Sequence, residues 1–490
     1  MSYFRSRRRF LQASSFAFGS GALTAIPSGQ TSAATSDSAA SKAAPEDVTR
    51  QLARYLVSAD WNSIPSDARD EAVRSVFNWV GCCLGGAREP ATDRAISALQ
   101  EFSGNPQATI LGRQEKFDIL HAALLNGITS HALDYDDTHL ETIIHPAGPV
   151  ASAILSLGER QRISGQEFQQ AFVLGVEVEC RIGKAVYSLH YDRGFHITGT
   201  TGVFGAAAAA GKLLGLNEQQ MVWALGIAAT QSAGLKEMFG TMCKPFHPGS
   251  AAQNGLKAAL LAARNFTSSE RSLEAPEGFA FTYSDAVDFS QITDGLGVTF
   301  EVSKNTYKPF ACGIVTHPII DGCIQLRNEQ SLTDTDIENV SLRVNPLVLS
   351  LTGKTAPQTG LEAKFSIYHA SAAAIIRGAA GPLEFTDAVV QDPAIIRLRN
   401  RVSATVDESV SEAEAFVTIT LNDGRMFEKH IEHAIGSLER PMTREALEQK
   451  FMGQAVVALP EQQLENVMAL CWDIESLADI NELTGATVPA

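Results

Sequence analysis

The 490-residue sequence lacks a long apolar run and a cysteine framework. A mildly apolar stretch at residues 13–26 is rich in glycine and serine, and it is shorter than the ~20 residues that a membrane-spanning helix needs. The seven cysteines are odd in number and irregularly spaced, in a chain long enough to fold without disulfide bonds. These absences argue against a transmembrane helix and against a disulfide-stapled scaffold.

Positive charge is also scarce. The chain has 39 lysines and arginines against 55 aspartates and glutamates, which gives a formal net charge of −16. Such a balance argues against nucleic acids and anionic membranes as partners. An anionic substrate would meet a repulsive overall field, so we expect its binding site to be locally basic.

Motifs of several enzyme classes are missing. The sequence contains no His-Glu-x-x-His, no paired Cys-x-x-Cys, no EF-hand loop and no Gly-x-Ser-x-Gly elbow. Glycines recur at Gly199, Gly202 and Gly205, but this spacing is not the Gly-x-Gly-x-x-Gly fingerprint of dinucleotide sites. We interpret these glycines as positions of close helix packing.

One segment, residues 131–145, is dense in groups that carry protons, with three histidines and three aspartates. Histidine titrates between pH 5 and 8, and neighbouring carboxylates shift its pKa or fix its tautomer. Three hypotheses fit the segment: a solvated helix end, a metal site, and metal-free acid/base catalysis on a small polar substrate. The segment alone leaves all three open.

Four further motifs follow along the chain in a regular order. They are Gly194-Phe195-His196-Ile197-Thr198-Gly199-Thr200-Thr201-Gly202, Gln231-Ser232-Ala233-Gly234-Leu235, Lys244-Pro245-Phe246-His247-Pro248-Gly249, and Lys308-Pro309-Phe310-Ala311-Cys312-Gly313 ahead of His317. Together with residues 131–145 they resemble the MmgE/PrpD family, which includes 2-methylcitrate dehydratase, cis-aconitate decarboxylase and iminodisuccinate epimerase. The resemblance covers roughly residues 45–435.

The resemblance implies chemistry on a small di- or tricarboxylate without a metal or an organic cofactor, in a homodimer. Carried over residue by residue, it implies the catalytic positions Asp134, His145, His196, Lys244 and His317. It implies the substrate-binding positions Lys244, Lys308 and His247. The histidines at positions 247, 317 and 369 also fit a purely structural role.

Local chemistry agrees with these positions. Lys244 lies on a segment closed by two prolines, where an ammonium group suits a carboxylate oxygen. His145 precedes Pro146, which disfavours helical backbone and lets the imidazole point into a cleft. His196 stands before a helix start, where free backbone N–H groups favour an anion. The three side chains therefore suit a carboxylate-binding site.

We interpret the chain as a metal-independent hydro-lyase that dehydrates 2-methylcitrate or a related alkylcitrate. Acid and base groups would remove a proton next to a carboxylate and protonate the departing hydroxyl. Alternatives are a cis-aconitate-type decarboxylase and an epimerase of an amino- or hydroxy-dicarboxylate such as iminodisuccinate. A non-catalytic carboxylate-binding protein is a further alternative.

Apolar periodicity predicts a mainly α protein with a smaller α+β part. Spacings of three and four predict helices over residues 65–85, 118–133, 150–157, 166–184, 206–216, 218–232 and 251–265. Alternation with period two predicts strands over residues 339–345 and 415–421, the second followed by a turn at residues 422–424. We expect a large helical domain over residues 45–285 and 436–490, and an α+β lid domain over residues 286–435.

The N-terminal residues differ from the rest of the chain. Ser6-Arg7-Arg8-Arg9-Phe10-Leu11 precedes the mildly apolar stretch and a tract rich in serine, alanine and threonine. This pattern is typical of a twin-arginine export signal, so we predict that residues 1–44 are signal and linker. The expected location is periplasmic or secreted, with a disordered basic tail and a cytoplasmic protein as the alternative.

Overall fold

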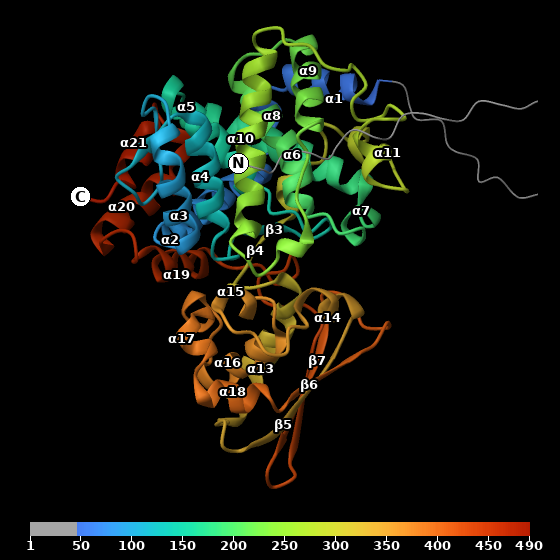
Figure 1. Ribbon diagram of the computed structural model, residues 1–490, viewed down its shortest axis with the longest axis vertical. Helices are drawn as coiled ribbons and strands as arrows, with labels where there is room; N and C mark the ends of the chain where they lie inside the picture. Colours follow the sequence, from blue (N-terminus) through green and yellow to red (C-terminus); the bar gives the residue numbers. More distant parts are fainter. Residues whose placement is uncertain (1–46) are drawn as a thin grey trace, which may run out of the picture. The chain divides into compact units, whose positions relative to one another are not determined.

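A computed structural model describes residues 47–490, so the predicted export signal lies outside the described residues. Within them the protein is mainly α, with 21 α-helices and a smaller α+β part (Figure 1). The helices of the first part are α1 (Val48–Ser58), α2 (Ser66–Gly86), α3 (Pro90–Leu99), α4 (Ile119–His131), α5 (Ala147–Gln161), α6 (Gly165–Val186), α7 (Leu189–Asp192), α8 (Ile197–Leu213), α9 (Glu218–Ala229), α10 (Cys243–Ala262), α11 (Phe279–Tyr283) and α12 (Ser290–Thr293). The helices predicted from apolar spacing are confirmed, with ends shifted by a few residues in most cases.

Two helices begin well before their predicted starts. Helix α8 begins at Ile197, so the glycines predicted to allow close packing lie inside it. An added Cβ at Gly202 would lie 2.5 Å from Pro149, and one at Gly205 would lie 2.8 Å from a backbone oxygen, which confirms the packing interpretation. Helix α10 begins at Cys243, so Lys244 and His247 lie in it. Pro245 is tolerated because N–H groups of the first turn have no intrahelical partner, whereas Pro248 lies inside the helix.

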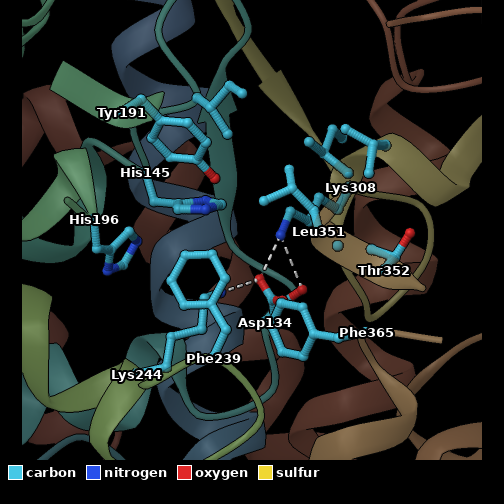
Figure 2. Close-up of a pocket in the computed structure, with 14 residues that line it drawn as sticks. Asp134, His145, Tyr191, His196, Phe239, Lys244, Lys308, Leu351, Thr352 and Phe365 are labelled. Carbon is cyan, nitrogen blue, oxygen red and sulfur yellow. Dashed lines mark hydrogen bonds and ion pairs between the residues drawn. The ribbon is translucent and has the colours of Figure 1, made fainter. Parts of the chain in front are cut away.

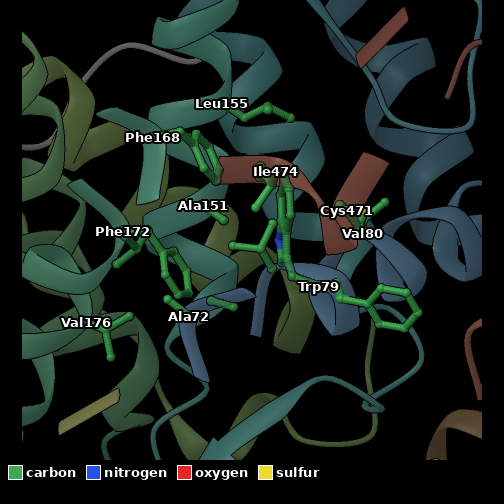
Figure 3. Packing of buried hydrophobic residues seen from close by; sticks show 14 of the residues in the cluster. Ala72, Trp79, Val80, Ala151, Leu155, Phe168, Phe172, Val176, Cys471 and Ile474 are labelled. Atoms are coloured by element: carbon green, nitrogen blue, oxygen red, sulfur yellow. The ribbon is translucent and has the colours of Figure 1, made fainter. Parts of the chain in front are cut away.

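The largest apolar core forms around α2. Trp79 of α2 is fully buried against side chains of α5 and α6, including Phe168 and Phe172 (Figure 3). The last helices, α19 (Arg444–Ala455), α20 (Glu461–Trp472) and α21 (Asn481–Ala486), return to this core. Phe77 stacks on Trp472 with ring centroids 4.2 Å apart. The C-terminal helices therefore close the core that the N-terminal helices begin.

The α+β part is built on a four-stranded sheet with the order β6-β5-β7-β8. Its strands are β5 (Ile337–Val344), β6 (Val402–Val406), β7 (Ala415–Leu421) and β8 (Met426–Ile431). Its helices are α13 (His317–Gln330), α14 (Pro346–Thr352), α15 (Gly360–Ala363), α16 (Ile367–Arg377), α17 (Asp387–Val390) and α18 (Pro393–Arg399). Buried and less buried residues alternate along β7, as the period-two pattern predicted, and the buried ones pack against α13 and α16.

Two short two-stranded sheets complete the fold, and one of them positions the histidine-rich segment. Strands β1 (Ala108–Thr109) and β2 (Lys116–Phe117) pair near α4. Strand β3 (Asp137–His139) pairs antiparallel with β4 (Asn305–Tyr307). This second pairing brings the segment after α4 beside the chain that leads to Lys308. None of the described helices is long and apolar enough to cross a membrane.

Candidate active site

Five of the predicted site residues line one cavity (Figure 2). Each comes from the end of a different element. The five are Asp134 after α4, His145 before α5, His196 at the start of α8, Lys244 in the first turn of α10, and Lys308 after β4. Residues that are up to 174 positions apart in the sequence are thereby hydrogen-bonded to one another.

Asp134 joins the two lysines of the cavity. Its Oδ1 accepts hydrogen bonds from the Nζ of Lys308 at 2.6 Å and the Nζ of Lys244 at 2.8 Å. Burial alone would raise the pKa of Asp134, but the two ammonium groups hold that pKa well below its usual value. Burial also lowers the pKa of Lys244, whereas Asp134 keeps the pKa of Lys308 above its usual value. The cavity thus holds a carboxylate between two cations.

His145 is held in one tautomer. Its Nδ1 lies 2.6 Å from the carbonyl oxygen of Asp137, and because a carbonyl only accepts, Nδ1 carries the hydrogen. The Nε2 atom of the neutral ring is then free to take up a proton. Burial and the nearby Lys308 lower the pKa of His145 well below its usual value. In the free protein the ring is therefore a neutral base at the cavity wall.

The other two aspartates of the segment have structural contacts. Asp136 Oδ2 accepts a hydrogen bond of 2.7 Å from the Nδ1 of His131. Asp137 Oδ2 accepts hydrogen bonds from the backbone N–H of Ala147 at 3.1 Å and from the side chain of Asn305 at 2.6 Å. Asp137 thus anchors the start of α5 to β4. Burial, reinforced by the nearby Asp136, raises the pKa of Asp137 to about 7.

His247 lies behind His196 and does not line the cavity. The Nδ1 atoms of the two rings lie 2.9 Å apart, so one ring donates a hydrogen to the other. Burial and Lys244 hold the pKa of His196 well below its usual value. His247 is a candidate to orient His196, and its predicted direct contact with substrate has no support from this geometry.

His317, the fifth predicted catalytic residue, lines a neighbouring cavity. The two cavities share Ile143, Ile314 and Val315 in their walls. Burial lowers the pKa of His317 to about 3, and its Nε2 has no hydrogen-bond partner among the described residues. His317 begins α13, beyond the turn that follows Lys308, and the charge of Lys308 also lowers its pKa.

Three histidines could together hold a cation. Ligand atoms of His131, His145 and His196 lie within 4.8 Å of one another, and all three rings are buried. The Nε2 of His131 has no partner among residues 47–490. Imidazole groups are common zinc ligands, but the adjacent ammonium group of Lys244 repels a cation. Asp136, which is hydrogen-bonded to His131, attracts a cation, so the charges around this donor set act in both directions.

Sequence reasoning missed most of the apolar and hydroxyl-bearing wall. Missed residues include Tyr191, Phe239, Leu351, Thr352 and Phe365. Phe239 stacks on Phe365 with centroids 5.4 Å apart, and the Nζ of Lys244 lies 5.3 and 5.4 Å from the two rings. Figure 2 shows the hydroxyl of Tyr191 directed into the cavity beside His145. These residues lie outside the motifs, so no sequence pattern indicated that they belong to the site.

Comparisons with known proteins agree with the geometry. The MmgE/PrpD N-terminal domain matches residues 50–292 and the MmgE/PrpD C-terminal domain matches residues 310–474. A cis-aconitate decarboxylase of Homo sapiens is 27% identical over 84% of this chain and 88% of its own length. The cis-aconitate decarboxylases of Mus musculus and Aspergillus terreus are 25% and 26% identical, each over 89% of this chain and over 92% and 95% of their lengths. The chain belongs to the MmgE/PrpD family.

Proposed function

We propose that this protein is a carbon–carbon lyase that decarboxylates cis-aconitate or a closely related unsaturated tricarboxylate. The observation that carries the proposal is the pair of buried lysines beside a tautomer-fixed histidine, in a chain whose relatives named above are cis-aconitate decarboxylases. The dehydration of 2-methylcitrate expected from the motifs has less support, because those relatives carry the name of the alternative reaction.

Lys244 and Lys308 are the proposed carboxylate ligands. Each ammonium group has three N–H donors, and Asp134 takes one from Lys244. Lys308 gives one to Asp134 Oδ1 and one, at 3.2 Å, to the Asp134 carbonyl. Donors therefore remain on both lysines for substrate carboxylates. Asp134 keeps the two Nζ atoms together, which would otherwise repel each other.

The reaction needs one proton and no redox partner. In cis-aconitate a CH₂–COO⁻ group is attached to a carbon–carbon double bond. When CO₂ leaves, the electron pair of the broken bond forms a new double bond to the CH₂ carbon. The pair of the old double bond moves to the CH carbon, which bears another carboxylate and takes up the proton. Negative charge spreads onto that carboxylate in the transition state, where an ammonium group stabilises it.

His145 is the proposed proton donor. The ring is neutral in the free protein, because burial and Lys308 lower its pKa. A bound tricarboxylate adds negative charge next to the ring and favours the imidazolium form. Nε2 would then carry the proton toward the substrate, while Nδ1 stays bonded to the Asp137 carbonyl. His196, which is held by His247, lies close enough to assist in placing the substrate.

The test is incubation of purified protein with cis-aconitate in D₂O, with CO₂ release and product NMR as readouts. We expect one CO₂ and one carbon-bound deuterium per product, with an unchanged rate in the presence of a chelator. The Lys244→Met variant should lose most of the activity. Lys257→Met is the matched control, because Lys257 lies on the same helix outside the cavity and binds Asn254.

Parallel incubations with 2-methylcitrate and iminodisuccinate distinguish the other reactions. Alkene formation from 2-methylcitrate without CO₂ release from cis-aconitate would contradict the proposal in favour of dehydration. Deuterium exchange in iminodisuccinate alone would favour an epimerase. Binding of all these acids without turnover would favour a carboxylate-binding protein.

A further inference from the structure

Three successive backbone carbonyls around Asp134 each accept a hydrogen bond from a different buried lysine. Lys364 Nζ donates to Leu133 O at 2.6 Å. Lys308 Nζ donates to Asp134 O at 3.2 Å, and Lys450 Nζ donates to Tyr135 O at 2.7 Å. We call these three side chains the lysine clamp. Their exposed fractions are 1% for Lys308, 5% for Lys364 and 7% for Lys450.

The three lysines of the clamp come from three separate parts of the chain. Lys308 follows β4, Lys364 ends α15 in the α+β part, and Lys450 lies in α19 near the C-terminus. The second bond of Lys364 goes to Ala311 O at 2.9 Å, and that of Lys450 goes to Asn78 Oδ1 at 2.7 Å. Lys364 therefore ties the Asp134 segment to the segment that carries Lys308. Lys450 ties the Asp134 segment to α2.

Burial of the Lys364 and Lys450 ammonium groups costs free energy. The hydrogen-bond acceptors of Lys364 and Lys450 are neutral oxygens, which compensate a buried ammonium group only in part. Burial accordingly lowers the pKa of each lysine to about 8. Asp134 meanwhile has a φ of 50°, a left-handed conformation that is strained for a residue other than glycine. The clamp holds the carbonyls on both sides of this strained residue.

We propose that Lys364 and Lys450 are positioning residues of the active site. With Lys308 they fix the backbone of residues 133–135, so that Asp134 holds the Nζ atoms of Lys244 and Lys308 against the cavity. They also add two positive charges behind the carboxylate-binding wall. The inference rests on the proposed function for its effect on turnover, but its effect on the backbone does not depend on the substrate.

The surroundings of the two lysines differ in a way that permits a sharp test. Lys364 lines a third cavity, together with Arg88, Glu89 and Gln454. Lys450 is not among the residues that line this cavity. A small alkylammonium ion can therefore reach the space left by Lys364→Ala through that cavity. Lys450 does not line this cavity, so the cavity gives no direct access to the space left by Lys450→Ala.

The experiment measures kcat/KM on cis-aconitate for Lys364→Ala and Lys450→Ala, with and without added n-butylammonium. We expect each variant to lose at least about 100-fold in kcat/KM, and butylammonium to restore at least about tenfold in Lys364→Ala alone. Tetramethylammonium, which has no N–H donor, should restore nothing. Lys364→Met keeps most of the packing without the donor and should lose activity as Lys364→Ala does, whereas Lys257→Ala should keep it.

Hydrogen exchange of a peptide that contains residues 133–138 gives a readout free of turnover. Exchange should accelerate in Lys364→Ala and slow again with butylammonium. Unchanged exchange and unchanged kcat/KM in both variants, or equal rescue by tetramethylammonium, would overturn the clamp. An inactive wild-type protein would overturn the proposed function alone, because the exchange experiment would still decide whether the clamp exists.

Discussion

At the scale of residues, Asp134 combines two destabilising features, a left-handed backbone and a buried carboxylate, with contacts that compensate them. Its left-handed backbone costs about 1–3 kcal/mol for a residue other than glycine, and its carboxylate is almost fully buried. Lys244 and Lys308 compensate the charge, and hydrogen bonds to the carbonyls on both sides compensate the strain. Because these contacts converge on the cavity wall, the strain lies where two cations line the cavity.

Replacement of His145 tests the proton donor. In His145→Asn the side-chain amide can still donate to the Asp137 carbonyl, but it carries no titrating group. We expect kcat to fall by about 10²–10⁴-fold with little change in melting temperature. His317→Asn is the matched control, since His317 lines the neighbouring cavity, and it should change kcat by less than about tenfold. Near wild-type kcat in His145→Asn would remove His145 from the mechanism.

Replacement of Asp134 tests the charge balance of the site. Asp134→Asn leaves two buried ammonium groups without their counter-ion, which should lower the unfolding free energy by about 3–5 kcal/mol at pH 7 and abolish turnover. The folded pKa of Asp134 lies below its ordinary value of 3.8, so this stabilisation is complete above pH ~5. It is lost as the pH falls below 3.8 toward the folded pKa.

The difference between wild type and Asp134→Asn in urea unfolding should therefore shrink as the pH falls from 5 to below 3. A difference that stays constant over this range would show that the carboxylate is not stabilised by the lysines. It would equally contradict the lowered pKa.

At the scale of elements, the site depends on two helices that pack at glycines. An added Cβ at Gly127 of α4 would lie 2.4 Å from the Cα of Gly249 in α10. Helix α4 leads into Asp134, and α10 carries Lys244, so their closeness sets the distance between the two side chains. The abundance of glycine and alanine in the sequence indicated close helix packing, but not which helices approach each other.

Gly127→Ala should therefore push α10 away from α4. We expect a loss of about 1–3 kcal/mol in unfolding free energy and a lower kcat/KM. Gly453→Ala is the control, because a Cβ at this exposed position of α19 meets nothing within 4 Å. It should leave kcat/KM unchanged and raise stability by up to about 1 kcal/mol. Equal effects of the two variants in thermal melts and kinetics would contradict the packing argument.

At the scale of the whole molecule, the net charge is negative although the site is rich in lysine. The chain carries a net charge of −16, yet Lys244, Lys308, Lys364 and Lys450 cluster around the Asp134 segment. The expectation of a locally basic site thus agrees with the structure. The homodimer implied by the family resemblance stays a prediction that sedimentation of the purified protein would test.

The predicted export signal is testable without structure. Residues 1–44 fused to a folded fluorescent reporter should direct it to the periplasm of a bacterium with twin-arginine transport. The conservative double replacement Arg7→Lys and Arg8→Lys should abolish that export, because the pathway reads the arginine pair. Cell fractionation measures the outcome, and export that persists in the double variant would contradict the twin-arginine assignment.

The sequence by itself determined the fold class, the family and five residues of the cavity. Helix and strand periods depend on residues close together in the chain, so the sequence predicts them. The motifs identified five residues that line the cavity: Asp134, His145, His196, Lys244 and Lys308. The net charge follows from composition alone, and it predicted a locally basic site for an anionic substrate.

Only the tertiary structure decided which groups meet. It placed His317 in the wall of the adjoining cavity, placed His247 behind His196, and added Tyr191 to the wall of the first cavity. These placements depend on contacts between segments far apart in the chain, and no local pattern encodes such contacts. The lysine clamp could not be predicted from the sequence for the same reason. Its three lysines lie on distant segments, and their role follows only from their hydrogen bonds to consecutive carbonyls.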